Sequence, residues 1–226
     1  MNFKIKGNEK KLLTVLVAVF FMGFTNSLLT RCTMGNDPCT FANLGISKTI
    51  GWTFGNWQLL FNTFLLVFCI IFCRNQMGWG TLANMILVGY SYDLTTWIEN
   101  KIMPETLVNA DGSFKSMGMK IGVMIPVLIL FIFFAALYMA VQLGTAPYDA
   151  LSYLIAEKSR LPFRPVRIAY DSFFAVVGII FGGKIGVVTI AMCLCLGPAV
   201  QWMHDNVIEK IFGEGKKSEL SGESGQ

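Results

Sequence analysis

Gly35-Asn36-Asp37-Pro38 and Gly144-Thr145-Ala146-Pro147 are two copies of a Gly-x-x-Pro stretch, and their positions decide the fold that we expect. The glycine and the proline of the first copy each lie 109 residues before their counterparts in the second. Each copy follows a long apolar block and opens a short, half-apolar segment, 39–50 or 148–158. Gly readily ends a helix, and Pro suits the first turn of the next one. The pattern therefore predicts a broken or interfacial short helix after each apolar block.

The composition around these stretches is that of a membrane protein. Of the 226 residues, 54% are hydrophobic and only 14% are charged, whereas an ordinary soluble domain has about 25% charged residues. Such a chain has too few polar groups to cover a water-soluble enzyme. Each membrane crossing needs about 20 apolar residues, so the length allows about six. The net charge of +4 does not indicate nucleic acid, because the basic residues lie between apolar blocks. The lipid bilayer is the partner that we expect.

We predict six membrane-spanning helices at 11–29, 57–73, 79–98, 119–143, 166–181 and 185–203. With this division, Lys and Arg are twice as frequent on the side of the termini as on the other side. The positive-inside rule then places both termini in the cytoplasm. We expect one membrane domain, 1–212, followed by a polar tail, 213–226, whose composition predicts disorder.

The 109-residue offset extends beyond the Gly-x-x-Pro stretches. It aligns Phe61-Asn62 with Tyr170-Asp171, and a shift of one residue aligns Gly89 with Gly197. We infer two copies, 11–98 and 119–212, and three spans per copy would insert the second copy upside down. The predicted fold is an all-α membrane protein of six transmembrane helices in two inverted three-helix repeats. Many secondary transporters share this plan and bind substrate near broken helices between the repeats. The alternative is a duplication that serves folding symmetry alone.

Polar groups inside the predicted spans are the candidates for function, because an ionisable side chain in a membrane is costly and rare. Asp171 is the first candidate for proton coupling or cation binding, and its alternative role is a structural pair with Arg164 or Arg167. Interface position and helix capping are the alternatives for Asp93 and Asp149. The helix N-termini at Pro38 and Pro147 are expected to face anionic groups of the substrate. Our substrate- or ion-binding candidates are Asp171, Asn62, Thr40, Asn43, Tyr148, Asp149 and Asp93, and the broken-helix residues are Gly35, Pro38, Gly144 and Pro147.

Catalytic and metal-binding patterns are missing from the sequence. There is no Gly-rich phosphate loop and no Gly-x-Ser-x-Gly elbow, and His204 is the single histidine. We therefore predict no enzyme activity, no cofactor and no metal. Cys32 and Cys39 lie near a predicted loop, and whether they form a disulfide is left open. Three glycines at every fourth position predict close helix packing, within the chain or in a homodimer; they are Gly178, Gly182 and Gly186. The alternative is that Gly182-Gly183 simply ends the span.

The stretch 35–45, GNDPCTFANLG, followed by Trp57-Gln58 and Asn62, resembles the first half of the YczE/YitT-type integral membrane proteins of bacteria. The stretch 144–151, GTAPYDAL, is similar to their second half, and Gly78-Trp79-Gly80-Thr81 is similar to the start of their third span. The resemblance covers about residues 12–212. It implies a multi-pass protein of the bacterial plasma membrane, and it suggests transport or export of a small molecule, as for some relatives. The chain departs from an even repeat where Val187-Val188-Thr189 replaces Trp79-Gly80-Thr81.

These observations predict a small-molecule secondary transporter or exporter that works by alternating access around a site between the repeats. The predicted alternative is a non-transporting accessory or scaffold protein that supports a partner system at the membrane. The substrate is expected to be a small molecule, and the sequence does not distinguish import from export.

Overall fold

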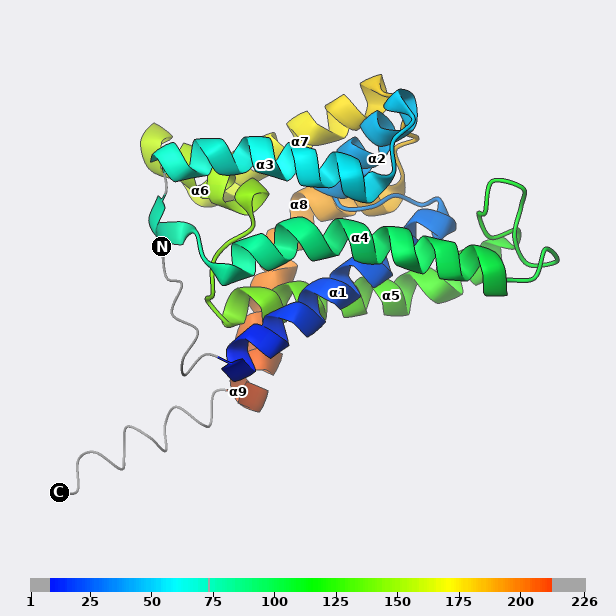
Figure 1. The fold of residues 1–226 in the computed structure, drawn as a ribbon, viewed down its shortest axis with the longest axis horizontal. Helices are drawn as coiled ribbons and strands as arrows, with labels where there is room; N and C mark the ends of the chain where they lie inside the picture. The colour runs from blue at the N-terminus through cyan, green and yellow to red at the C-terminus, as the bar shows by residue number, and fades with distance from the viewer. Residues whose placement is uncertain (1–8, 73, 213–226) are drawn as a thin grey trace.

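The computed structural model describes residues 9–72 and 74–212, and the regular elements of this part of the chain are helices (Figure 1). The elements are α1 (Glu9–Cys32), α2 (Pro38–Ile50), α3 (Phe54–Phe72), a 3-10 turn (Arg74–Gln76), α4 (Trp79–Ile102), α5 (Met117–Ala140), α6 (Pro147–Ser159), α7 (Phe163–Ile180), α8 (Val187–Met203), a π turn (His204–Ile208) and α9 (Glu209–Phe212). The all-helical fold is therefore confirmed. The predicted tail, 213–226, and Cys73 lie outside the described residues.

Four helices in the described part of the chain are long and apolar enough to cross a membrane. They are α1, α3, α5 and the continuous run Val187–Ile208. The two other predicted spans, α4 and α7, are more polar: α7, for example, carries Arg164, Arg167 and Asp171. The count of six crossings therefore stays a prediction.

The two Gly-x-x-Pro stretches form the same local structure. The short helices α2 and α6 begin at their prolines, as predicted, and each has 13 residues. Gly35 and Gly144 have φ values of +109° and +120°, a region that residues with a Cβ rarely adopt. Thr33 and Gln142, which precede them, also share a positive φ, of 53° and 55°. The chain thus turns in the same way after α1 and after α5.

The helices of the two halves, α1–α4 and α5–α9, pack in corresponding pairs. Figure 1 shows α1 and α5 running antiparallel across the lower part of the view, with α4 beside α1. α8 packs against α5, α2 packs against α7, and α6 packs against α3. The short helix α2 therefore packs on α7, the helix that follows α6. In the same way, α6 packs on α3, the helix that follows α2. The core between α1, α5 and the C-terminal helices includes Val15, Val19, Ala136 and Ile208.

Each Gly-x-x-Pro loop also holds the start of a long helix from the other half. The Gly80 amide donates to the Leu143 carbonyl at 2.8 Å, and the Val188 amide donates to the Met34 carbonyl at 2.9 Å. A Cβ on Gly78 would lie 2.3 Å from the Leu143 oxygen, and one on Gly186 would lie 1.9 Å from the Met34 oxygen. Glycine is thus needed at both contacts, at Gly78 and at Gly186. The start of α8 keeps this close contact although the residues after Gly186 differ from those after Gly78.

The three regularly spaced glycines do not share one helix, because α7 ends at Ile180. Gly178 packs against Phe41 and Ala42 of α2, Gly182 takes a positive φ in the turn after α7, and Gly186 contacts Met34. Their close packing is therefore within the chain, and the single helix face expected from their spacing is not formed. Cys32 and Cys39 are both free thiols, so the disulfide that was left open does not form.

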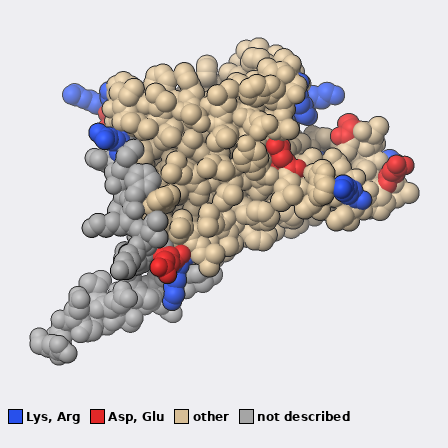
Figure 2. All heavy atoms as spheres, in the orientation of Figure 1, with Lys and Arg blue, Asp and Glu red and all other residues tan. Residues whose placement is uncertain are grey.

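The surface is largely apolar. Figure 2 shows a broad uncharged face, with most of the charged side chains gathered toward the two ends of the long axis. Large side chains such as Phe64, Ile71, Phe173 and Ile180 are more than half exposed on α3 and α7. An apolar surface of this extent fits a lipid environment.

Candidate functional site

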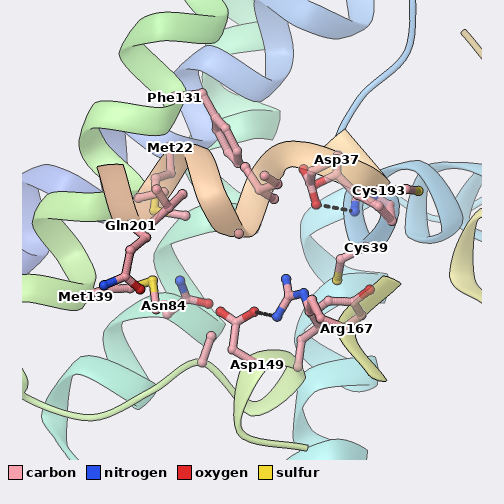
Figure 3. Close-up of a pocket in the computed structure, with 18 of the residues that line it drawn as sticks. Met22, Asp37, Cys39, Asn84, Phe131, Met139, Asp149, Arg167, Cys193 and Gln201 are labelled. Atoms are coloured by element: carbon pink, nitrogen blue, oxygen red, sulfur yellow. Dashed lines mark hydrogen bonds and ion pairs between the residues drawn. The ribbon is translucent and has the colours of Figure 1, made fainter. Parts of the chain in front are cut away.

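A cavity of about 520 Å³ lies between the two halves. Its walls come from the N-termini of α2 and α6 and from α1, α3, α4, α5, α7 and α8. Figure 3 shows Asp37 and Asp149 reaching toward the open space from opposite sides, with Arg167 beside Asp149. The polar lining residues are Asn26, Asp37, Thr40, Gln58, Asn62, Asn84, Tyr148, Asp149, Tyr153, Arg164, Arg167, Gln201 and His204.

Arg167 joins two carboxylates at the wall of this cavity. Its guanidinium donates to Asp149 Oδ1 at 2.5 Å and to Asp171 Oδ2 at 3.0 Å. The hydroxyl of Tyr148 donates to the other oxygen of Asp171 at 2.8 Å. Asp171 is only 1% exposed, whereas the side chains of Arg167 and Asp149 are 16% and 24% exposed. The geometry thus pairs Asp171 with Arg167, one of its two expected alternatives, and places Arg167 in the cavity wall with Asp171 directly behind it.

The structure gathers most of the predicted site residues but not all. Thr40, Asn62, Tyr148 and Asp149 line the cavity, and Asp171 contacts it through Tyr148 and Arg167. Two candidates do not line it. The Asn43 side chain accepts a hydrogen bond from the indole of Trp57 at 2.9 Å, and the Asp93 carboxylate accepts one from the Gly55 amide at 2.9 Å. Both of these bonds tie helices together.

Nine further polar residues line the cavity and were not among our candidates, and three of them differ from the rest: Asn26, Asp37 and Gln58. One side-chain oxygen of each is buried and lacks a hydrogen-bond partner within the described residues. Asp37 uses its other oxygen to cap α2, accepting from the Thr40 amide at 3.0 Å. The sequence held a signal for Gln58, because the 109-residue offset aligns it with Arg167 just as it aligns Asn62 with Asp171.

The cavity opens at the end of the molecule that carries α9. Arg164 and Gln201 line it and are exposed, and His204 is partly exposed. Tyr153 and Phe163 stack at this mouth, with ring centroids 4.3 Å apart and an interplanar angle of 8°. We call this opening the α9-end mouth.

The opposite end of the molecule carries the loop 103–116 (Figure 1), and packed side chains close it. Leu44, Phe54 and Tyr92 form a buried cluster there, in which the rings of Phe54 and Tyr92 are 4.4 Å apart. The backbones of α3 and α4 touch beside this cluster, since a Cβ on Gly89 would lie 2.7 Å from the Cα of Gly55. We call these five residues the loop-end seal.

The loop-end seal and the α9-end mouth occupy corresponding positions in the two halves. An offset of 109 residues relates Leu44, Phe54 and Gly55 to Tyr153, Phe163 and Arg164. The offset of 108 that relates the starts of α4 and α8 pairs Gly89 with Gly197 and Tyr92 with Val200. All five counterparts line the cavity. Tyr153 and Phe163 stack on each other, but a Cβ on Gly197 would meet nothing within 4 Å, whereas one on Gly89 would lie 2.7 Å from the Cα of Gly55. The approach of α3 to α4 is therefore tight at the seal, and the corresponding place between α7 and α8 is open.

A second polar cluster lies at the loop end, away from the cavity. Arg31 pairs with Glu99, and both are buried. The guanidinium also donates to the Gly112 carbonyl and to Asn100 Oδ1, each at 2.7 Å, and Ser27 donates to Glu99 at 2.9 Å. These bonds fasten the loop 103–116 onto the ends of α1 and α4.

Comparison with known proteins adds the family. The model of a family of unknown function, DUF6198, matches residues 9–205, which is most of the chain. The chain belongs to the DUF6198 family. This match spans both halves and includes every residue that we assign to the cavity, the mouth and the seal, so the site lies wholly within the DUF6198 region.

Three curated relatives resemble this DUF6198 protein over most of its length. The "Uncharacterized protein YyaS" of Bacillus subtilis is 26% identical over 197 residues, covering 87% of this chain and 92% of the relative. An "Uncharacterized protein" of Haemophilus influenzae is 24% identical over 206 residues, covering 89% and 86%. The "Uncharacterized membrane protein YczE" of Bacillus subtilis is 28% identical over 166 residues, covering 73% and 71%. These matches confirm the YczE-type resemblance and, with the apolar helices, a membrane protein. No solved structure matches the chain significantly.

Proposed function

We propose that this DUF6198 protein is a small-molecule secondary transporter that works by alternating access. The observation that carries the proposal is a polar cavity in an otherwise apolar molecule, open at the α9-end mouth and closed at the loop-end seal. Buried polar groups without partners cost free energy. A protein that only needed to fold in lipid would gain stability by filling this space with apolar side chains.

We further propose that six helices cross the bilayer as two inverted repeats, with α4 and α7 included. The ionisable groups that make these two helices more polar are largely turned inward: Glu99 and Asp171 are 7% and 1% exposed, and both are paired. The antiparallel course of α1 and α5 supports the inversion (Figure 1). The distribution of Lys and Arg supports the plasma membrane orientation in which both termini, and the α9-end mouth, face the cytoplasm.

Alternating access follows from the correspondence between the seal and the mouth. Two halves of like structure can exchange their conformations. In the exchanged state, Val200 would close onto the stacked Tyr153 and Phe163, as Tyr92 packs with Leu44 and Phe54 in this structure. The loop-end seal would then open, and the cavity would face the other side of the membrane. Asp171 remains our coupling candidate, because protonation would weaken its hold on Arg167 next to the bound solute.

Purified protein in liposomes tests the proposal. We expect uptake or release of at least one solute from a broad panel, driven by a pH gradient. Asp171→Asn keeps the size of the side chain but removes its charge, so we expect it to abolish the dependence on the gradient. Asp111→Asn, in the exposed part of the loop 103–116, is the matched control and should behave as the wild type. The transport proposal fails if no solute moves, and the coupling role fails if Asp171→Asn transports with an unchanged pH dependence.

The alternative, a scaffold that supports a partner, makes a different prediction for the same experiment. It predicts no solute flux from the wild type. It also predicts that single cysteines placed along α3 and α7 are uniformly protected from polar thiol reagents. Transport instead predicts a water-accessible stripe along both helices, at the cavity positions around Asn62 and Arg167.

A further inference from the structure

We propose that the cavity binds a protonated organic amine. The inference deepens the proposed function and rests on it for the role of the cavity, but the binding chemistry stands on separate observations. They are the charge of the wall, the kind of polar atom that lacks a partner, and the shape and aromatic character of the space.

The buried charges of the site are predominantly negative. Asp37, Asp149 and Asp171 contribute three carboxylates, and Arg167 is the guanidinium that faces them. Arg167 is already shared between Asp149 and Asp171, so Asp37 has no cationic partner among the described residues. The other lining arginine, Arg164, is exposed at the mouth. A buried carboxylate without a partner attracts a cation.

The fully buried atoms of the lining residues that lack a partner are hydrogen-bond acceptors. They are Asn26 Oδ1, Asp37 Oδ2 and Gln58 Oε1. These three side chains are 2%, 8% and 5% exposed, and all three line the cavity. Buried acceptors are satisfied by donors, and an ammonium group offers three N–H donors and no acceptor. The charge of the wall and its three fully buried acceptors therefore favour the same ligand group.

The size and the aromatic wall favour an organic cation over an inorganic one. About 520 Å³ falls in the range of small-molecule pockets and is far larger than a single ion needs. Tyr148, Tyr153, Phe131 and Phe163 contribute rings to the lining. Aromatic faces attract cations and pack well against hydrocarbon.

The N-termini of α2 and α6 do not favour the anionic substrate that the sequence suggested. Each carries its own carboxylate at the start of the helix: Asp37 caps α2, and Asp149 lies in the first turn of α6. These carboxylates already meet the positive ends of the helix dipoles. A second anion at either position would be repelled by them.

Isothermal titration calorimetry on the full chain in detergent tests the inference without requiring transport. The probes are 2-phenylethylamine, 2-phenylethanol and 3-phenylpropionate, which share a ring and differ in the polar group. At pH 7 we expect the amine to bind about tenfold or more tightly than the alcohol, since hydrogen bonds to charged groups are stronger than neutral ones. We expect no binding of the carboxylate. Equal binding of amine and alcohol, or tighter binding of the carboxylate, would overturn the proposal.

Two variants locate the binding group. Asp37→Asn keeps an acceptor for the helix cap and removes the charge, so amine affinity should fall about tenfold or more. Gln58→Met removes one acceptor at similar size and should weaken the amine more than the alcohol. Asp111→Asn is the charge-matched control and should leave both affinities unchanged. If Asp37→Asn does not fold, Gln58→Met and the three titrations of the wild type still show whether the cavity prefers the amine.

Two outcomes separate this inference from the proposed function. If the amine binds through Asp37 but no amine crosses the liposome membrane, the ligand class stands and transport fails. If liposomes transport only neutral or anionic solutes, transport stands and the ligand class fails. Replacing KCl by NaCl at constant ionic strength should leave amine affinity unchanged. Loss of amine binding in NaCl would overturn the inference in favour of an inorganic sodium site.

Discussion

At the scale of single residues, Arg167 compensates the two carboxylates of Asp149 and Asp171. Removing one partner of a buried ion pair leaves an uncompensated charge and costs about 3–5 kcal/mol. We expect Arg167→Met, which keeps much of the side-chain length, to lower the free energy of unfolding by about this amount. The measurement is the thermal unfolding midpoint of the purified protein in detergent, which should fall clearly below that of the wild type.

A rescue experiment shows whether charge or packing is responsible. The triple variant Arg167→Met, Asp149→Asn, Asp171→Asn removes all three charges together. Replacing a complete buried charge cluster by neutral groups of similar volume is often close to neutral for stability, so the triple variant should regain most of the lost unfolding midpoint. A triple variant as unstable as the single one would attribute the loss to packing of the Arg167 side chain instead.

Some residues of this site could be predicted from the sequence, and others could not. Asp171 and Asp149 were identifiable because charge is rare in apolar segments. Asp37 was part of a quoted stretch but was not recognised as a site residue, since a carboxylate before a proline is first of all a helix cap. Asp93 was included for its apparent membrane depth, and the structure gives it a bond to Gly55 instead. Tertiary packing decides which polar atoms lack hydrogen-bond partners, so the local sequence cannot predict them.

At the scale of elements, Gly35 and Gly144 set the direction of the short helices. Both combine a positive φ with crowding: a Cβ on Gly35 would lie 2.5 Å from Thr189 Oγ1, and one on Gly144 would lie 2.6 Å from Thr81 Oγ1. We expect Gly35→Ala and Gly144→Ala each to lower the free energy of unfolding by about 3 kcal/mol, from backbone strain and overpacking together. Thermal unfolding in detergent measures the change.

Gly51 provides the matched control for this prediction. It ends α2 with φ at +73°, and a Cβ there would meet nothing within 4 Å. Gly51→Ala therefore carries backbone strain alone, about 1 kcal/mol. If Gly51→Ala destabilises the protein as much as Gly35→Ala does, the contact between the Gly-x-x-Pro loop and α8 is not what requires glycine at position 35.

The loop 103–116 joins α4 to α5, and the sequence predicted no role for it. Arg31 holds it through Gly112 and pairs with Glu99. We expect Arg31→Met to release the loop, because it removes these bonds and leaves Glu99 buried without a cation. Limited proteolysis of the variant should cut within 103–116 under conditions in which the wild type stays intact. Protection equal to that of the wild type would show that Phe114, whose amide donates to the Arg31 carbonyl, suffices to hold the loop.

Helix boundaries illustrate what element-level prediction can reach. The starts of α2 and α6 were predicted to within a residue because Pro and Gly act locally. The start of α7, at Phe163 rather than 166, and the end of α4, at Ile102 rather than 98, were not. Both extensions carry charged residues, Arg164 and Lys101. A prediction from hydropathy places the end of a helix at the edge of the apolar block, whereas the hydrogen-bonded helix continues beyond that edge.

At the scale of the whole molecule, the two halves share their short helices and crowded glycines but differ in how closely the helices around them pack. The sequence indicated corresponding halves through a handful of identities at one offset. It could not indicate that the backbones meet at Gly55 and Gly89 while the corresponding Gly197 has open space beside it, because corresponding residues do not reveal how closely each pair of helices packs. That difference between the two ends is a property of the assembled fold, and it makes alternating access testable.

Single cysteines at Phe54 and Phe163 probe this difference, since the two residues hold corresponding positions in α3 and α7. Phe54 is 4% exposed in the loop-end seal, whereas Phe163 lines the α9-end mouth. In a variant without native cysteines, we expect a charged maleimide to label Phe163→Cys quickly and Phe54→Cys slowly in open membrane sheets, where both faces are accessible. Transport requires a second state with the opposite pattern, so a solute that is carried should raise labelling of Phe54→Cys while lowering that of Phe163→Cys. Labelling of both positions that no solute alters would contradict exchange between the halves, even if the cavity binds an amine.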